Sequence, residues 1–172
     1  MNLLKELWIL IKLMFATHPS DILGSEMEVM TMKHFPFTGY RYMCWCGKVI
    51  TRDKMREVIE RFKNTNSGKI SYNHEYIHAI QAVSEHGDNW PRYYLNYLYH
   101  WLKHNPLVKP SHACYYFNRY EVEAYAMERD FDYWKIYSRR NLRGKFTLRK
   151  PRKKWKDAGG TASAWKKFVK TL

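Results

Sequence analysis

The stretch that most constrains this chain is Asn73-His74-Glu75-Tyr76-Ile77-His78-Ala79-Ile80-Gln81, which contains the pattern His-Glu-x-x-His. In a helix, two histidines four positions apart project from the same face, one turn apart. Two imidazole nitrogens placed in this way can both reach one Zn²⁺ ion, at about 2.0–2.1 Å each. Glu75 follows the first histidine, where a carboxylate can take a proton from a water at the metal. The stretch therefore predicts two metal ligands, His74 and His78, and a general base, Glu75.

The surrounding residues favour a helix over this stretch. Apolar residues recur at helical spacing at Tyr76, Ile77, Ile80 and Val83. Asn73 is a candidate N-cap, and Gly87 suits the position just past the last turn. The opposite side of the helix is a polar stripe made of His74, His78, Gln81 and Glu85. Because so short a pattern also arises by chance, the alternative is a surface helix that happens to carry two histidines.

A hydrolytic zinc site needs a third protein ligand and one open position for water. The candidates are Glu121 and Glu123, which lie 43 and 45 residues beyond His78. Glu121 has a structural alternative, because Asn118 as N-cap and a glutamate three residues later resemble a capping box. The alternative for Glu123 is an exposed helix carboxylate. These residue types alone leave the third ligand open.

Other histidines and the cysteines offer weaker sites. His100 and His104 are also four apart on an aromatic helix predicted from Trp90 to about His104, but this pair lacks a neighbouring glutamate and stands beside Lys103. The cysteines, Cys44, Cys46 and Cys114, are too few for a disulfide framework and suit reduced thiols in an intracellular protein.

The positive charge of the chain is concentrated near its C-terminus. The whole chain carries +14, and residues 138–172 hold 13 basic residues against one acidic residue, Asp157. Residues 1–137 are therefore nearly neutral. The segment 139–172 suits an anionic membrane surface or a nucleic acid as partner, although a solvated, partly disordered segment also explains it. No zinc finger or other base-reading module is recognisable.

Residues 3–15, LLKELWILIKLMF, are apolar but interrupted by Lys5, Glu6 and Lys12. This segment is shorter than the about 20 residues that cross a bilayer. It also lacks the uninterrupted apolar core and cleavage site of a signal peptide. We expect an amphipathic helix within residues 1–20 that docks on the domain, or else one that lies in a membrane interface. The expected location is cytoplasmic, with peripheral contact with a membrane as the alternative.

The remaining pattern predicts an α+β fold that is mainly helical and forms one domain. Alternation over residues 40–51 predicts one or two strands, hence a small antiparallel sheet before the motif helix. Further predictions are a short helix in 22–33, a helix from Asp53 to about Phe62, a loop at 64–68, an extended entry at 69–72, and one long helix from Asn118 to about residue 140.

The motif helix and a later segment together resemble a known family. His74-Glu75-Tyr76-Ile77-His78-Ala79-Ile80-Gln81, followed by an aromatic helix and by Tyr120-Glu121-Val122-Glu123-Ala124-Tyr125-Ala126, is similar to small bacterial zinc metallopeptidases of the HExxH zincin class, in particular gluzincins. The order and spacing match from about Phe35 to Tyr133. The resemblance implies a minimal zincin-like metallopeptidase domain over residues 1–137, with the basic segment 138–172 as a C-terminal tail.

The resemblance also implies roles for particular residues. The glutamate of a Glu-x-x-Ala pattern is the third ligand in related gluzincins and falls on Glu121, with Glu123 as runner-up. Many gluzincins have an aspartate four residues later, where this chain has Tyr125. The implied function is zinc-dependent hydrolysis of peptide bonds, with a peptide or protein substrate held by an edge strand around Met43 to Val49. The oxyanion donor is left open among Tyr120, Tyr125, His112 and Arg119.

Two other functions compete with this one. The first is a non-catalytic, zincin-like binding module that keeps zinc for structure or recognition. The second is a binder of nucleic acid or anionic membrane that acts through residues 139–172.

Overall fold

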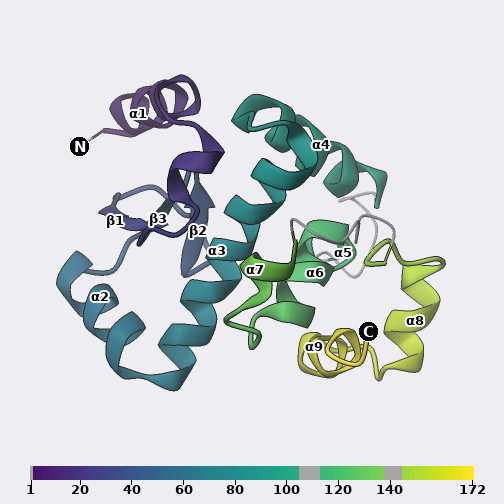
Figure 1. Ribbon diagram of the computed structural model, residues 1–172. Coiled ribbons are helices and arrows are strands. Elements are labelled where there is room, and N and C mark those ends of the chain that lie inside the picture. Colours follow the sequence, from purple (N-terminus) through teal and green to yellow (C-terminus); the bar gives the residue numbers. More distant parts are fainter. Residues whose placement is uncertain (1, 105–112, 138–144) are drawn as a thin grey trace. The chain divides into compact units, whose positions relative to one another are not determined.

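The computed structural model describes residues 2–104, 113–137 and 145–172, and most of them are helical (Figure 1). The chain divides into two compact units, Met1–Pro91 and Arg92–Leu172. The first unit combines a three-stranded sheet with helices, and the described residues of the second form helices and their connections, without a strand. The predicted fold class, a mainly helical α+β protein, is confirmed.

The sheet of the first unit is small and mixed. Its strands are β1 (Glu28–Thr31), β2 (Tyr42–Trp45) and β3 (Lys48–Thr51), in the order β1-β3-β2. Strands β2 and β3 form the antiparallel hairpin expected within 40–51, whereas β1 pairs with β3 in parallel. The prediction of a purely antiparallel sheet was therefore wrong in this respect. Parallel strands are joined by a long connection, so a local sequence pattern does not predict that β1 pairs with β3.

The β2–β3 turn requires a glycine at its second position. Cys46 and Gly47 both have positive φ, 49° and 71°, as a two-residue hairpin turn demands. A Cβ atom at Gly47 would lie 1.7 Å from Cδ1 of Ile22. The positive φ therefore disfavours any larger residue at this position, and a Cβ atom would also force the Ile22 side chain to move.

The helix predicted within residues 22–33 was wrong. The segment instead contains the end of a 3₁₀ helix, η1 (Pro19–Ile22), and strand β1. Two of the four residues of β1, Val29 and Thr31, are β-branched, and Met30 pairs with Ile50 of β3. Tertiary pairing therefore decides the conformation of this segment over its weak helical pattern.

The helix α3 (Asn66–His86) is two turns longer than predicted. Thr65 is its N-cap and accepts a hydrogen bond from the amide of Gly68, so the predicted loop at 64–68 and extended entry at 69–72 were wrong. The close approach to α2 (Met55–Asn64) requires Gly68, since a Cβ there would lie 2.0 Å from the Arg61 carbonyl oxygen. Asn73 lies inside the helix, whereas Gly87 ends it in a left-handed conformation as predicted.

The N-terminal helix α1 (Leu3–Ala16) is docked on the sheet, the first of its two predicted alternatives. Leu10 packs in a cluster with Met32, Phe35 and Ile50. Glu6 is fully buried, and its carboxylate accepts hydrogen bonds from the backbone amides of Lys33 and His34 at 2.8 and 2.9 Å. The acidic residue that interrupts the apolar segment therefore fixes the helix in place. No helix among the described residues has the length and apolarity that crossing a membrane requires.

The second unit contains six helices among its described residues. They are α4 (Trp90–Lys103), α5 (Ala113–Tyr116), α6 (Arg119–Met127), α7 (Tyr133–Tyr137), α8 (Pro151–Asp157) and α9 (Ala162–Val169). The first of them, α4, begins at Trp90, just before this unit starts at Arg92. The bounds of α4 confirm the helix predicted from Trp90. The single helix predicted after Asn118 is interrupted between α6 and α7, where Asp130 accepts hydrogen bonds in a turn.

The basic segment 145–172 is folded: a few of its apolar side chains are buried, while most of its lysines and arginines stay exposed. Trp155, Trp165 and Val169 join Phe146 in a buried cluster that includes residues of α6. The indole of Trp165 also donates a hydrogen bond to the Tyr116 carbonyl oxygen at 2.9 Å. Residues 145–172 are therefore not disordered, because their aromatic side chains form part of a core. The many lysines between these aromatic residues made this core hard to predict from the sequence. The predicted boundary between a domain that ends at residue 137 and a tail that begins at residue 138 stays a prediction.

Candidate metal centre

The two motif histidines lie one turn apart on α3 and are buried. Their ring centroids are 5.2 Å apart and the rings are nearly perpendicular, at 85°. Each residue is only 7% exposed. Burial of an imidazole ring costs free energy unless its nitrogens form hydrogen bonds or bind a metal. The helix thus presents two adjacent nitrogen ligands in a setting shielded from water, as the spacing predicts.

Gln81 sets the tautomer of His78. Its Oε1 atom lies 2.9 Å from Nδ1 of His78, and Gln81 is fully buried. An amide oxygen only accepts, so Nδ1 of the neutral ring carries the proton. The other nitrogen, Nε2, is then left with its lone pair for a metal. The sequence places Gln81 on the polar stripe three residues after His78, but its role in orienting that ring was missed.

Glu75 lies on the same helix and close to strand β2. It is 8% exposed. Burial, together with the negative charge of Glu75, raises the pKa of the Cys44 thiol in the middle of β2. In the part of the chain that the structure describes, the strand order β1-β3-β2 places β2 at an edge of the sheet. The candidate base therefore lies beside an edge strand, and this strand includes part of the predicted segment from Met43 to Val49.

In the second unit, Glu121 lies in the first turn of α6 and is buried. Its Oε1 atom accepts a hydrogen bond from the Tyr97 hydroxyl at 2.6 Å. The side chain of Asn118 caps this helix by accepting a hydrogen bond from the backbone amide of Tyr120. The backbone amide of Asn118 donates to the Tyr115 carbonyl oxygen. The reciprocal bond of a capping box is therefore not formed by Glu121.

Tyrosines surround the Glu121 carboxylate within the second unit. Burial and the charge of Glu121 together raise the pKa values of Tyr115, Tyr116 and Tyr125. The hydroxyls of Tyr115 and Tyr125 are 3.2 Å apart. Tyr125, which occupies the position of the expected aspartate, is therefore engaged with another tyrosine. Tyr97 was not predicted, because it lies 24 residues before Glu121 and belongs to no motif.

The runner-up ligand Glu123 has a different environment. It is also buried, and its Oε1 atom accepts a hydrogen bond from the Tyr133 hydroxyl at 3.0 Å. Two residues apart on a helix, Glu121 and Glu123 point about 160° away from each other. They cannot both face the same ion.

His74, His78 and Glu121 form a buried group that could hold a metal ion. Each offers one ligand atom, and these atoms all lie within 4.8 Å of one another. Glu123 is not part of this group. Two imidazoles and one carboxylate are the donor set of His₂Glu zinc sites, so the chemistry of these side chains fits zinc.

The rival histidines lie in aromatic surroundings in the second unit. The His100 ring packs edge-on against Tyr120, and the His104 ring packs edge-on against Phe117. Burial and the nearby charges of Lys103 and Arg152 lower the pKa of His104. Neither histidine belongs to the group that could hold a metal ion, and the ring contacts favour a packing role for both.

Of the four candidate oxyanion donors, three are described and His112 lies outside the described residues. Arg119, Tyr120 and Tyr125 are all buried on α6. The Arg119 guanidinium stacks on the Tyr120 ring, 4.2 Å from its centroid. The choice among these candidates stays open.

Comparison with known proteins gives no relative for this chain. No family model, curated protein or solved structure matches it. The resemblance to gluzincins therefore rests on the motifs alone.

Proposed function

We propose that the chain is a zinc-dependent peptidase whose metal is held by His74, His78 and Glu121. The single observation that carries the proposal is the buried grouping of these three side chains. Two imidazoles and a carboxylate leave one position open for water or substrate. A bound zinc ion would lower the pKa of a water to about 7 and polarise the scissile carbonyl.

Glu75 is the general base in this proposal. It follows His74 directly on α3 and is buried in the first unit. A carboxylate in this place takes a proton from the attacking water and passes it to the leaving amine. The residues packed around Glu75 shield its carboxylate from bulk water. Charges interact more strongly in such a low-dielectric setting than in water.

Strand β2 supplies a place for an extended peptide. One side of β2 is hydrogen-bonded to β3, and its other side is an edge. Main-chain groups on an edge strand can hold a substrate by strand addition. Because β2 lies beside Glu75, a peptide bound there would run past the proposed base.

The test uses Glu75→Gln, which removes the base and preserves size. The matched control is Glu85→Gln, the same change on the polar stripe of the same helix. We expect purified protein to hold one zinc per chain and to cleave an unfolded protein substrate. Glu75→Gln should keep the zinc and lose at least about 100-fold in cleavage rate, as removal of a general base does. Glu85→Gln should retain both zinc and activity.

Two results separate the alternatives. A folded wild-type chain that takes up no zinc overturns the metal centre itself. Zinc binding with no cleavage of any peptide, and no difference between Glu75→Gln and wild type, would instead identify a non-catalytic binding module.

A further inference from the structure

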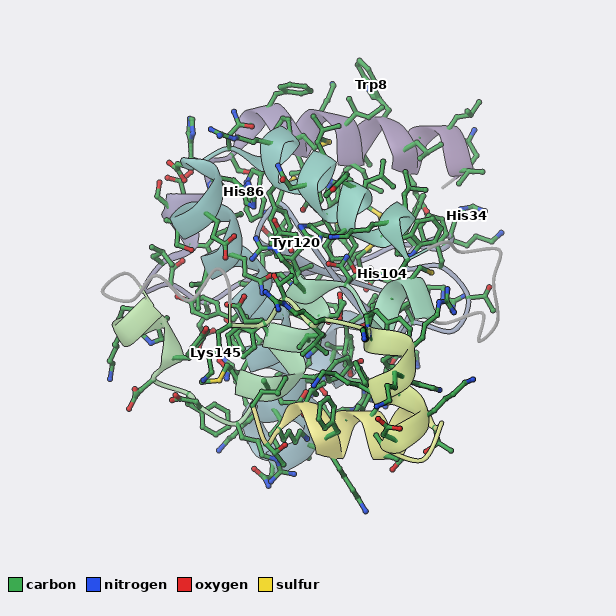
Figure 2. All side chains as sticks on the ribbon, turned by 90° about the vertical axis from the view of Figure 1, so that its right-hand side faces the viewer. Trp8, His34, His86, His104, Tyr120 and Lys145 are labelled. Atoms are coloured by element: carbon green, nitrogen blue, oxygen red, sulfur yellow. The ribbon has the colours of Figure 1, made fainter. Side chains whose placement is uncertain are left out.

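The outward side of α1 is apolar along its whole length. At 100° per residue, six large side chains fall within an arc of about 140°: Leu3, Leu4, Leu7, Trp8, Ile11 and Phe15. Leu4, Trp8 and Phe15 are 76%, 57% and 77% exposed. Figure 2 shows Trp8 pointing away from the ribbon. A contiguous exposed apolar strip of this kind marks an interaction surface.

The contacts of the inner side prevent α1 from turning this strip inward. Glu6 accepts hydrogen bonds from the backbone amides of Lys33 and His34. The carbonyl oxygen of Leu10 accepts a hydrogen bond from the Trp45 indole at 2.9 Å. These bonds lie one turn apart on the inner side of the helix and fix its rotation about its own axis. The apolar arc is therefore held outward by the fold.

The charges on α1 favour an anionic partner. Lys5 and Lys12 are exposed and lie together along one border of the apolar arc. The one acidic residue of the helix, Glu6, is buried on the opposite side. Lys12 lies over the Trp8 ring, 5.2 Å from its centroid, so a cation and an indole meet at this border. Apolar side chains bordered by tryptophan and lysine suit the boundary between acyl chains and anionic headgroups.

We propose that α1 binds the surface of a bilayer that contains anionic lipid. The helix lies flat, with its apolar arc among the acyl chains and with Lys5 and Lys12 at the headgroup phosphates. Its 14 residues are too few to cross the bilayer. This binding does not depend on the proposed peptidase activity.

A second copy of the chain is a less suitable occupant than a membrane. The exposed side of α1 has lysines but no carboxylate. Two such helices packed face to face would therefore bring lysines together without an acidic partner. A lipid surface meets both demands, since it offers apolar chains and phosphate in adjacent layers.

The experiment measures co-sedimentation of the full chain with vesicles of phosphatidylcholine, alone or mixed with phosphatidylserine. The first variant combines Leu4→Gln, Trp8→Gln and Phe15→Gln, which are more than half exposed, so folding should be retained. We expect wild type to bind the mixed vesicles and the triple variant to bind at least about 100-fold more weakly, since three large apolar side chains no longer insert. Circular dichroism checks that the variant keeps its helices.

A second pair of variants tests the charges. Lys5→Glu with Lys12→Glu should weaken binding to the mixed vesicles by more than about 10-fold, as each lysine near an anionic surface contributes roughly a fivefold factor. The matched control is Lys54→Glu with Arg56→Glu, two side chains on the exposed surface around α2 that are 86% and 91% exposed. This control has the same net charge and should bind like wild type.

Three outcomes would overturn the proposal. The first is a folded wild-type chain that stays in solution with both kinds of vesicle. The second is a triple variant that binds as tightly as wild type, which would assign the binding to the lysines of residues 145–172. The third is a wild-type dimer that the triple substitution dissociates while neither form binds vesicles, which would assign the face to a second copy.

Discussion

Helices α1 and α3 both bury side chains that usually stay in water, but they differ in what those side chains meet. On α1, the buried Glu6 carboxylate accepts hydrogen bonds from two backbone amides, and Nδ1 of His34 lies 3.2 Å from it. On α3, His74, Glu75 and His78 are buried in succession, with two imidazoles that can converge on a common point. The first arrangement is explained by the chain itself, while the second has the composition of a metal site.

The difference shows how a buried polar group can be interpreted. Burial of a charged group lowers stability unless hydrogen bonds or charges compensate. Backbone amides compensate Glu6, so its role is to attach a helix. On α3, His74 and His78 belong instead to a buried group, with Glu121, that could hold a metal ion. Glu6 therefore attaches α1 to the first unit, whereas for His74 and His78 we propose a metal-binding role.

The largest expected effect is the loss of zinc from the α3 site. His74→Ala removes one of three proposed ligands and should weaken zinc binding by at least about 1,000-fold. His34→Ala removes a half-buried histidine beside Glu6 and should leave zinc affinity unchanged. Competition with a chromophoric chelator measures both affinities. Equal losses in the two variants would break the distinction between the two sites.

The second effect concerns the attachment of α1. Glu6→Ala leaves two partly buried backbone amides without their acceptor and should lower the free energy of unfolding by about 2–3 kcal/mol. Glu26→Ala is the control, because the Glu26 side chain is 82% exposed and its surface ion pair with Lys63 contributes little. Urea unfolding measures both. If Glu6→Ala proved as stable as Glu26→Ala, α1 would not be held as described.

The third effect is finer and concerns the orientation of His78. Gln81→Ala removes the acceptor for Nδ1 and should weaken zinc binding by about 10- to 100-fold. Gln81→Glu retains an oxygen at the same position and should lose less affinity. The same chelator competition measures these variants. An unchanged affinity in Gln81→Ala would show that the hydrogen bond at 2.9 Å does not orient a ligand.

The smallest effect is a pH dependence of stability that arises from Glu6. Burial raises the pKa of this carboxyl, but hydrogen bonds from the backbone of His34 and Lys33 outweigh burial, so the pKa is lowered overall. The folded state therefore binds the proton less readily than the unfolded state. The stabilisation is fully present above the unfolded pKa of about 4.3 and is lost as the pH falls through the lower, folded value.

Unfolding of wild type and Glu6→Gln from neutral pH down to about pH 3 isolates this contribution, since the variant cannot ionise at that position. The stability advantage of wild type should shrink as the medium becomes acidic. An advantage that grows on acidification would contradict the lowered pKa.

Local spacing predicted much of the candidate site. The four-residue interval places His74 and His78 together on a helix, and Asn118 begins the helix that carries Glu121. The interval between His78 and Gln81 also held the signal for their hydrogen bond, because residues three apart share a helix face. Tyr97 had no comparable signal, since it reaches Glu121 from another helix.

Features set by distant contacts could not be predicted. Strand β1 exists because Glu28–Thr31 pairs with Lys48–Thr51, about 20 residues away. Glu6 looked like an interruption of an apolar segment, because nothing nearby in sequence shows the amides it meets. Trp155 and Trp165 were hidden among lysines, although their burial organises the C-terminal helices.

The metal content of the purified chain tests the central claim most directly. Protein dialysed against metal-free buffer and analysed by mass spectrometry should hold one zinc per chain in wild type and in Glu75→Gln, and none in His74→Ala. A folded wild-type chain that holds no zinc, and takes up none when zinc is added at neutral pH, would contradict the account.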